Sequence, residues 1–232
     1  MSRAHATATA PTASATKSRV LLVDDHPVVR RGLALMIDAE PDLTVCGEAE
    51  SYEQAVASID RLKPDVAVVD ISLGGRSGID LIKDVRGKKP DLPILVLSMH
   101  DESLQAERAL RAGAKGYIMK REATSNVIGA IRHVIKGGIY VSDRISARLL
   151  GKMADAPAGT RSPLERLSDR ELEIFNLIGQ GLSPRTIAER FGLSVKTVEA
   201  HRENIKGKLG LSSSNELIRY AVQHWLDQQS GS

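Results

Sequence analysis

The pattern of hydrophobic and polar positions divides the chain into two regions of different character. Over residues 19–140, short apolar runs alternate with stretches in which apolar residues recur every three or four positions. Runs of the first kind are typical of buried strands, and the second spacing is typical of amphipathic helices. The alternation predicts a doubly wound α/β fold, in which helices cover both faces of a buried five-stranded parallel sheet.

The positions of the expected elements follow from these runs. The strands are expected at Val20–Asp24, Leu43–Ala49, Val66–Asp70, Ile94–Ser98 and Gly116–Met119. The helices are expected at Val28–Ala39, Ser51–Leu62, Gly78–Val85, Leu104–Ala112 and Ala123–Lys136.

Residues 163–228 show helical spacing throughout. Ser168 begins the segment Ser-Asp-Arg-Glu171, which has the sequence of a capping box, so a helix is expected from there to Ile178. Glycines and a Ser-Pro pair mark the boundaries of the helices that follow. These are expected at Arg185–Arg190, Val195–Lys208 and Asn215–Asp227. The region is therefore predicted to form a small all-α domain.

Two segments lie outside the expected domains. Residues 1–18 are mostly Ala, Thr and Ser and offer little apolar surface to bury, so a disordered tail is expected. Residues 141–162 include the small, turn-prone stretch Met153-Ala-Asp-Ala-Pro-Ala-Gly-Thr160, which is typical of a linker. The expected organisation is a tail, an α/β domain at 19–140, a linker and a helical domain at 163–228.

Composition narrows the class of protein. The chain has 232 residues, of which 42% are hydrophobic and 26% charged, as in ordinary globular proteins. No apolar stretch reaches the ~20 residues of a membrane helix, and the single cysteine, Cys46, fits a reducing compartment. We therefore expect a cytoplasmic protein. The net charge of +3 is concentrated in no segment, so nucleic-acid binding must be inferred from local geometry.

Charged and hydroxyl side chains lie at or directly after the ends of four of the expected strands. Asp24, Asp70 and Ser98 are the last residues of the first, third and fourth expected strands, and Asp25 and Lys120 come directly after the first and fifth. Ligands of open parallel sheets bind beyond the carboxyl ends of the strands, so these side chains are expected in one cleft. A strand-end aspartate is usually a turn former or a helix cap, and this is the alternative for each residue taken alone.

The expected cleft has the groups that phosphoryl transfer needs. Carboxylates placed together favour a bound cation, and Mg²⁺ takes oxygen ligands and bridges to phosphate. Asp70 would be the nucleophile that forms an acyl phosphate. Lys120 would offset the charge of the transferred group, and Ser98 could donate a hydrogen bond to a phosphoryl oxygen.

Four motifs occupy these positions: Leu22-Val-Asp-Asp-His-Pro27, Val69-Asp-Ile-Ser-Leu-Gly-Gly-Arg-Ser-Gly78, Leu97-Ser98 and Gly116-Tyr-Ile-Met-Lys120. With them, residues 19–140 resemble the receiver domain of response regulators, a flavodoxin-like fold. The resemblance implies that Asp70 accepts a phosphoryl group from a histidine kinase. It also implies that Asp25, Asp70 and the backbone carbonyl of Ser72 hold Mg²⁺, with Asp24 assisting through water.

The same resemblance implies a conformational switch. Ser98 and Tyr117 would form the switch pair, with the hydroxyl moving toward the phosphate and the ring turning inward; a plain sheet residue is the alternative for Tyr117. One position departs from the family pattern. In the loop after Asp70, relatives usually have a proline before the glycine, whereas this chain has Gly74-Gly75. This loop is expected to be more flexible than in relatives.

The C-terminal domain contains two helices joined by a tight turn with a glycine, as in a helix-turn-helix. In the second helix Val198, Ile205 and Leu209 are spaced to face a core. Its other positions are expected to face outward and contact DNA phosphates and bases. These are Lys196, Thr197, Glu199, Ala200, Arg202, Glu203 and Lys206. A helical bundle with a solvated charged face is the alternative.

Three further segments favour DNA binding: Leu167-Ser-Asp-Arg-Glu-Leu172, Gly181-Leu-Ser-Pro-Arg-Thr-Ile-Ala188 and Ser194-Val-Lys-Thr-Val-Glu-Ala-His-Arg202. They resemble a LuxR-type DNA-binding domain, with the helix-turn-helix at 183–202. The two domains together resemble the NarL/FixJ class of response regulators. This implies a transcription regulator, switched by a sensor kinase, that binds a DNA operator as a homodimer through its last helix.

Two other readings remain open at this stage. An aspartate-nucleophile phosphohydrolase would also use Asp70 and Mg²⁺, but it typically has an acidic residue two positions later, where this chain has Ser72. We therefore expect no enzyme of that class. The second alternative is a regulator whose α/β domain acts without phosphorylation, as a dimerisation or ligand-binding module.

Overall fold

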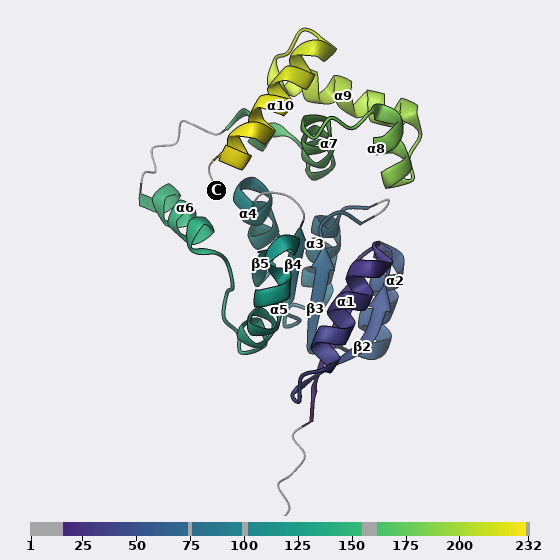
Figure 1. Cartoon of the computed structure of the whole chain (residues 1–232), viewed down its shortest axis with the longest axis vertical. Coiled ribbons are helices and arrows are strands. Elements are labelled where there is room, and N and C mark those ends of the chain that lie inside the picture. The colour runs from purple at the N-terminus through teal and green to yellow at the C-terminus, as the bar shows by residue number, and fades with distance from the viewer. Residues whose placement is uncertain (1–15, 74–75, 99–101, 155–161, 231–232) are drawn as a thin grey trace, which may run out of the picture.

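The structure is a computed structural model that describes residues 16–73, 76–98, 102–154 and 162–230. It has an α/β domain, a helix that follows it, and a C-terminal helical domain, arranged as in Figure 1. Among the described residues, no helix is both long and apolar enough to cross a membrane.

A five-stranded parallel sheet forms the centre of the α/β domain, as predicted. Its strands are β1 (Ser18–Val23), β2 (Leu43–Ala49), β3 (Val66–Asp70), β4 (Ile94–Ser98) and β5 (Gly116–Met119). They lie in the order β2-β1-β3-β4-β5. In the register of the sheet Asp70 pairs with Leu97, and Ser98 pairs with Met119. The carboxyl ends of β3, β4 and β5 therefore lie along one edge.

Helices cover both faces of this sheet. They are α1 (Pro27–Asp38), α2 (Tyr52–Leu62), α3 (Gly78–Lys88), α4 (Glu102–Ala112) and α5 (Lys120–Ile135). Buried residues of α1 and α5 form one hydrophobic cluster with the sheet, and those of α2, α3 and α4 form another. Ser51 and Ser77 cap α2 and α3 by accepting a backbone hydrogen bond. The doubly wound fold predicted from the sequence is confirmed.

A helix occupies part of the range that was expected to be a linker. Helix α6 (Asp143–Ala154) directly follows the α/β domain. Its Ile145 is 3% exposed, and Ile145 and the partly buried Leu149 belong to the hydrophobic cluster that includes α4. This tertiary packing explains why a segment of modest helical signal is ordered as a helix. Residues 155–161, with the turn-prone part of the expected linker, lie outside the described residues.

The C-terminal domain is all-helical, as predicted. It consists of the 3₁₀ helix η1 (Pro163–Arg166), α7 (Asp169–Gly179), α8 (Pro184–Phe191), α9 (Val195–Leu209) and α10 (Ser214–Ser230). The capping box at Ser168 and Glu171 is present. Gly192 follows α8 with a φ of +61°, in the left-handed region that ends the helix. Helices α7, α8, α9 and α10 enclose a core of their own.

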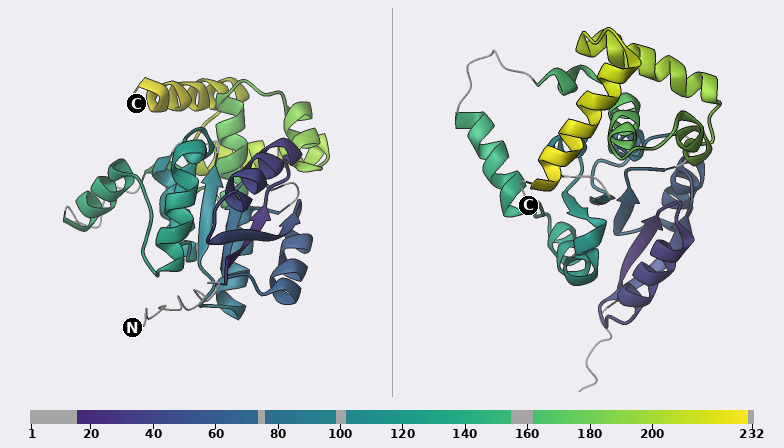
Figure 2. Two further views of the ribbon diagram at one scale, coloured as in Figure 1. Left: turned by 60° about the horizontal axis from the view of Figure 1, so that its bottom comes forward. Right: turned by 45° about the horizontal axis from the view of Figure 1, so that its top comes forward.

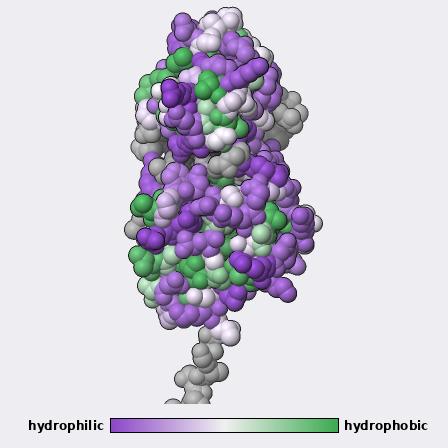
Figure 3. Space-filling view, turned by 90° about the vertical axis from the view of Figure 1, so that its right-hand side faces the viewer, coloured by the Kyte–Doolittle hydropathy of each residue, from purple (hydrophilic) through white to green (hydrophobic). Residues whose placement is uncertain are grey.

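The C-terminal domain sits above the carboxyl edge of the sheet. Helix α7 is the part of this domain that lies over α3 and β3, while α9 and α10 lie farther away (Figures 1 and 2). The face that carries α1, α2 and α8 is mostly hydrophilic. Its hydrophobic patches lie mainly on the α/β domain, the lower half of the view in Figure 3. The exposed apolar residues of α1 are Val28 and Leu35.

Candidate functional site

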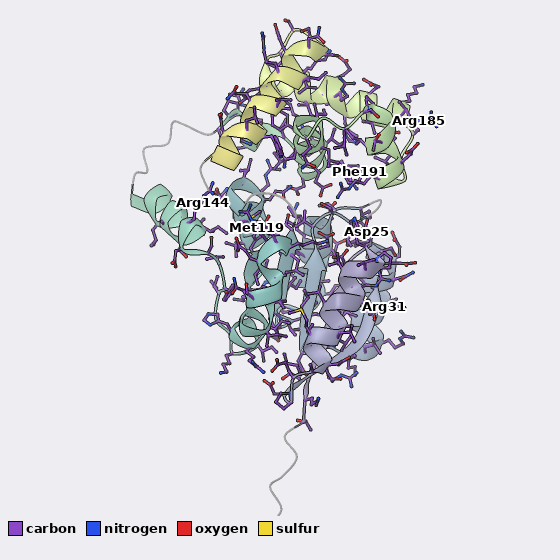
Figure 4. The ribbon with its side chains drawn as sticks, viewed as in Figure 1. Asp25, Arg31, Met119, Arg144, Arg185 and Phe191 are labelled. Carbon is purple, nitrogen blue, oxygen red and sulfur yellow. The ribbon has the colours of Figure 1, made fainter. Side chains whose placement is uncertain are left out.

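Three elements bring charged side chains to the carboxyl edge of the sheet. Strand β1 ends at Val23, so Asp24 and Asp25 follow it directly, and Asp70 is the last residue of β3. Lys120 is the first residue of α5, immediately after β5. In Figure 4, Asp25 lies at the edge of the sheet that faces the C-terminal domain. The groups predicted to share a cleft are therefore brought together.

Lys120 connects two of the carboxylates. Its Nζ lies 2.6 Å from Asp24 Oδ2 and 2.7 Å from Asp70 Oδ2, and its side chain is only 5% exposed. Burial opposes a charge on this amine, but the carboxylates of Asp70 and Asp24 outweigh it, so the pKa of Lys120 is raised. The lysine therefore carries its charge inside the cleft, where a fixed ammonium interacts strongly with anions.

Asp70 is buried, and a backbone hydrogen bond holds its carboxylate in place. Its side chain is 2% exposed, and its Oδ1 accepts a hydrogen bond of 3.1 Å from the backbone N–H of Ser72. Burial, together with the negative charge of Asp24, raises the pKa of Asp70 to about 6 against the lowering effect of Lys120. At neutral pH most of the Asp70 carboxylate is therefore ionised and able to attack an electrophile.

The donor atoms of this cleft suit a hard divalent cation. Asp24, Asp25, His26 and Asp70 each offer a donor, and these atoms lie within 4.8 Å of one another. Three carboxylates facing one lysine leave negative charge uncompensated, and their oxygen atoms are the ligands that Mg²⁺ prefers. The predicted set of Asp24, Asp25 and Asp70, with Ser72 two residues after Asp70, therefore fits the ion by its chemistry.

Sequence reasoning did not assign a role to His26. Its Nδ1 lies 2.7 Å from Asp25 Oδ1 and 3.2 Å from Asp24 Oδ1, and its side chain is 46% exposed. The backbone N–H of His26 also donates to Asp24 Oδ1 over 2.8 Å. The sequence signal that could have pointed to His26 is its place directly after the acidic pair. A protonated imidazole at this position adds a positive charge to the cleft.

Gly78 allows α3 to start against the backbone of Asp70. A Cβ atom on Gly78 would lie 2.3 Å from the backbone oxygen of Asp70, closer than any side chain tolerates. The N–H of Gly78 donates to the oxygen of Ile71 over 2.8 Å, which closes the loop after β3. The Gly74-Gly75 pair, singled out in the sequence, lies outside the described residues.

The expected switch residues are both buried. Ser98 is 0% exposed, and its Oγ donates to Gln105 Oε1 of α4 over 3.3 Å. The Tyr117 ring is 1% exposed and belongs to the same hydrophobic cluster as Ala106 of α4. Both residues therefore adjoin α4, which lies against α6 and faces η1.

The predicted DNA-contacting residues of α9 divide into two groups. Lys196, Thr197, Ala200 and Glu203 are exposed, as expected. The outward placement of Arg202 is wrong, because this residue is only 9% exposed. It lies four residues after Val198 and three before Ile205, on the core side of the helix.

Ion pairs hold four of these side chains. Arg202 Nη1 donates to Glu199 Oε1 over 2.8 Å. Lys206 Nζ lies 2.9 Å from Glu203 Oε1, with the lysine side chain 15% exposed. Asn204 was not predicted, although it is exposed and lies four residues after Ala200 on the same face. The outer face of α9 therefore remains open while the two domains are packed together.

Comparison with known families identifies both domains. The family described as "Response regulator receiver domain" matches residues 20–132. The family described as "Bacterial regulatory proteins, luxR family" matches residues 165–221. The chain therefore belongs to the DNA-binding response regulators of two-component systems that carry a LuxR-type helix-turn-helix domain, the NarL/FixJ class.

Individual relatives agree with this assignment. The oxygen regulatory protein NreC of Staphylococcus aureus strain JH9 is 37% identical over 210 residues, which cover 88% of this chain and 97% of NreC. The RcsB response regulator of Salmonella typhimurium is a structural match with a TM-score of 0.64 and 26% identity, covering 90% of this chain and 98% of RcsB. RcsB of Salmonella enterica serovar Typhimurium, bound to the promoter rprA in the presence of a phosphomimetic, has a TM-score of 0.59 and 25% identity. The match covers 89% of this chain and 99% of RcsB.

Proposed function

We propose that a partner histidine kinase switches this regulator by phosphorylating Asp70. The observation that carries the proposal is the contact of Lys120 Nζ with Asp70 Oδ2 at 2.7 Å and Asp24 Oδ2 at 2.6 Å. A buried ammonium beside an ionised carboxylate can also approach a phosphoryl oxygen, and so stabilise charge that develops during transfer.

The transfer step needs only one new bond at the acceptor. A carboxylate oxygen of Asp70 attacks the phosphorus of a phosphohistidine, the N–P bond breaks, and the histidine nitrogen takes a proton from solvent. Asp24, Asp25, Asp70 and the carbonyl of Ser72 would hold Mg²⁺, which supplies charge neutralisation at the phosphoryl oxygens. Lys120 would hold the transferred group from the other side.

The switch would pass from the acceptor to α4. Ser98 Oγ now donates to Gln105 of α4, and a phosphoryl group on Asp70 would compete for this hydroxyl. Tyr117 lies behind the same helix and would respond to its movement. A phosphoryl group can shift this equilibrium only as far as it binds the two conformations differently.

The output would be operator binding by a dimer in the cytoplasm, where the DNA is. The helix-turn-helix at 183–202 would offer Lys196 and Thr197 for phosphates and Ala200 for base edges, and Glu203, in the part of α9 that follows, would also reach base edges. Solved relatives include RcsB dimers bound to DNA. Two half-sites about one helical turn apart are expected for such a dimer.

The test is the mass of the intact protein after incubation with Mg²⁺ and acetyl phosphate, with Asp70→Asn as the control. We expect one added phosphoryl group on the wild-type chain and none on the variant, together with operator binding that increases only for the wild type. Equal labelling of both proteins would refute Asp70 as the acceptor. No labelling with unchanged operator binding would favour a regulator that acts without phosphorylation.

A further inference from the structure

Polar contacts join the α/β domain to the C-terminal domain. The carboxylate of Asp169, at the start of α7, lies 2.8 Å from Lys83 Nζ of α3 and 3.0 Å from Arg108 Nη1 of α4. Ser77 Oγ donates a buried hydrogen bond of 2.9 Å to Glu173 Oε1, also of α7. These contacts hold α3 and α4 beside the first residues of the C-terminal domain, and side chains do not fill all the space between them.

The remaining space is a cavity of about 920 Å³ between α3, α4, η1 and the start of α7. Small-molecule sites in proteins have volumes of roughly 300 to 1,000 Å³ and occur preferentially at domain interfaces. Part of the wall is apolar, since Ile79 and Leu167 are buried there and Leu104 of α4 packs against the hydrophobic core of the C-terminal domain. The cavity therefore suits a small organic molecule that contacts both domains.

Basic residues dominate the charged part of the wall. They are Lys83 and Arg86 of α3, Arg108 and Arg111 of α4, and Arg166 of η1. The carboxylates that line the same cavity are those of Glu107, Glu165 and Asp169, so five cations face three anions and two positive charges are in excess. A concave surface with an excess of one sign of charge attracts ligands of the opposite sign. The expected occupant is therefore an anion.

Two of these arginines, one from each domain, are the side chains best able to bind an anion. Arg111 Nη2 lies 2.6 Å from Glu107 Oε1, yet the arginine side chain is 74% exposed. Arg166 is exposed, and its side chain has no ion-pair partner among the residues that the structure describes. A guanidinium is a planar fork of donors that binds a phosphate through two hydrogen bonds. Lys83 and Arg108, in contrast, are already bound to Asp169.

We propose that this cavity binds a nucleoside diphosphate, with its phosphates on Arg111 and Arg166 and its base against the apolar wall. A nucleoside diphosphate carries at least two negative charges, which offset the two excess cations. Its base has flat faces that pack against apolar side chains and guanidinium groups. A bare phosphate has no group for the apolar wall, and an uncharged hydrophobic molecule has none for the arginines.

This ligand acts on the arrangement of the domains. Because its site has walls from both domains, it binds the packed arrangement more tightly than the separated domains, and it stabilises packing as its concentration rises. The concentration of a nucleotide is thus a second input to the protein, received at a site other than Asp70.

The test is calorimetric titration of the full chain with adenosine diphosphate and, separately, with guanosine diphosphate. No Mg²⁺ is added, so the carboxylates of the acidic cleft repel the phosphates and do not compete for the ligand. We expect one molecule of at least one nucleotide to bind per chain, more tightly than the corresponding nucleoside or pyrophosphate. Hydrogen exchange of residues 104–112 and 164–169 should slow about tenfold when the nucleotide is at ten times its Kd.

Variants of the wall identify the site. Arg166→Ala and Arg111→Gln each remove one charge, and we expect each to weaken binding by about tenfold or more, as for the loss of hydrogen bonds to a charged group. Arg166→Lys keeps the charge without the planar fork, so its affinity should be intermediate. Arg185→Ala is the matched control, because Arg185 is an 83% exposed arginine of the same domain that lies on α8 and does not line the cavity (Figure 4). It should bind the nucleotide as the wild type does.

Four results would overturn the proposal. The first is that neither nucleotide binds at millimolar concentration. The second is wild-type affinity in both Arg166→Ala and Arg111→Gln. The third is an equal loss of affinity in Arg185→Ala and Arg166→Ala, which would place the nucleotide on the DNA-binding surface. The fourth is binding of pyrophosphate as tight as that of the nucleotides, which would mean an adventitious ion only.

Discussion

At the scale of single residues, Asp70 is surrounded by groups that fix both its position and its charge. Lys120 contacts one carboxylate oxygen, and the N–H of Ser72 donates to the other. Gly78 lies against the backbone oxygen of Asp70. A change at any of these three residues should therefore alter the surroundings of Asp70 without changing the carboxylate itself.

Gly78→Ala is expected to lower the free energy of unfolding by about 1–3 kcal/mol, because the new methyl group overlaps the Asp70 carbonyl. It should also slow labelling by acetyl phosphate. Gly87→Ala in the same helix is the matched control, since a Cβ there meets nothing within 4 Å. We expect the control to stabilise the protein by about 0.5–1 kcal/mol. Urea unfolding of both variants measures the difference, and equal effects would contradict this account of Gly78.

The residues of the acidic cleft were predictable from the sequence because parallel strands end at one edge. Any charged residue that follows such a strand must lie near the others, so Asp24, Asp70 and Lys120 needed no further information. The orientation of side chains was harder to predict. Arg202 was assigned to the outer face of its helix, yet Val198 and Ile205 turn that position toward the core. A long polar side chain gave no signal of this burial.

At the scale of elements, most helices were predictable because their boundaries carry chemical signals. Serine caps and left-handed glycines mark the ends of the helices in the C-terminal domain. Helices η1 and α6 were missed. Helix α6 owes its stability to the packing of Ile145 against the α/β domain, and η1 is bound through its carbonyl oxygens by Arg108. Contacts between distant segments stabilise both, and such contacts leave no local pattern.

Lys196→Ala is the prediction for the recognition helix. Lys196 is exposed at the start of α9, where a cation can contact a DNA phosphate. We expect weaker binding to all DNA sequences and a slope of log affinity against log salt that falls by about 1. Lys136→Ala at the end of α5 makes the same change of charge on the receiver, and it should leave the slope unchanged. Loss of affinity confined to one base position would show that Lys196 reads sequence instead.

At the scale of the whole molecule, the arrangement of the domains depends on pairs of residues that are far apart in the chain. The contacts of Arg108, Lys83 and Ser77 with the C-terminal domain join residues separated by 61, 86 and 96 positions. Each of these side chains is ordinary in its local segment, so the sequence contained no sign of its partner. The family, the two domains and their functions were predictable, whereas their mutual packing was not.

The buried Glu173 predicts how stability depends on pH. Its pKa in the folded protein is about 7, above the ordinary value of 4.5. Between pH 4.5 and 7 the folded state therefore binds more protons at this group than the unfolded state does. The contribution of Glu173 to the free energy of unfolding is fully present below pH 4.5, and it is lost as the pH rises through 7. Thermal unfolding from pH 4.5 to 8 should show Glu173→Gln gaining about 3 kcal/mol relative to the wild type. A constant difference between the two proteins would contradict the raised pKa.

The exposure of the outer face of α9 in the packed molecule has a consequence for the search for an operator. Non-specific association with DNA depends on cations near phosphates, and it allows a protein to slide and hop along the duplex. Lys196 and its exposed neighbours are available for this in the packed form. We therefore expect unphosphorylated molecules to reside on the chromosome already. A signal would then change how long a molecule stays at its operator, because association with the chromosome would already have taken place before the signal arrives.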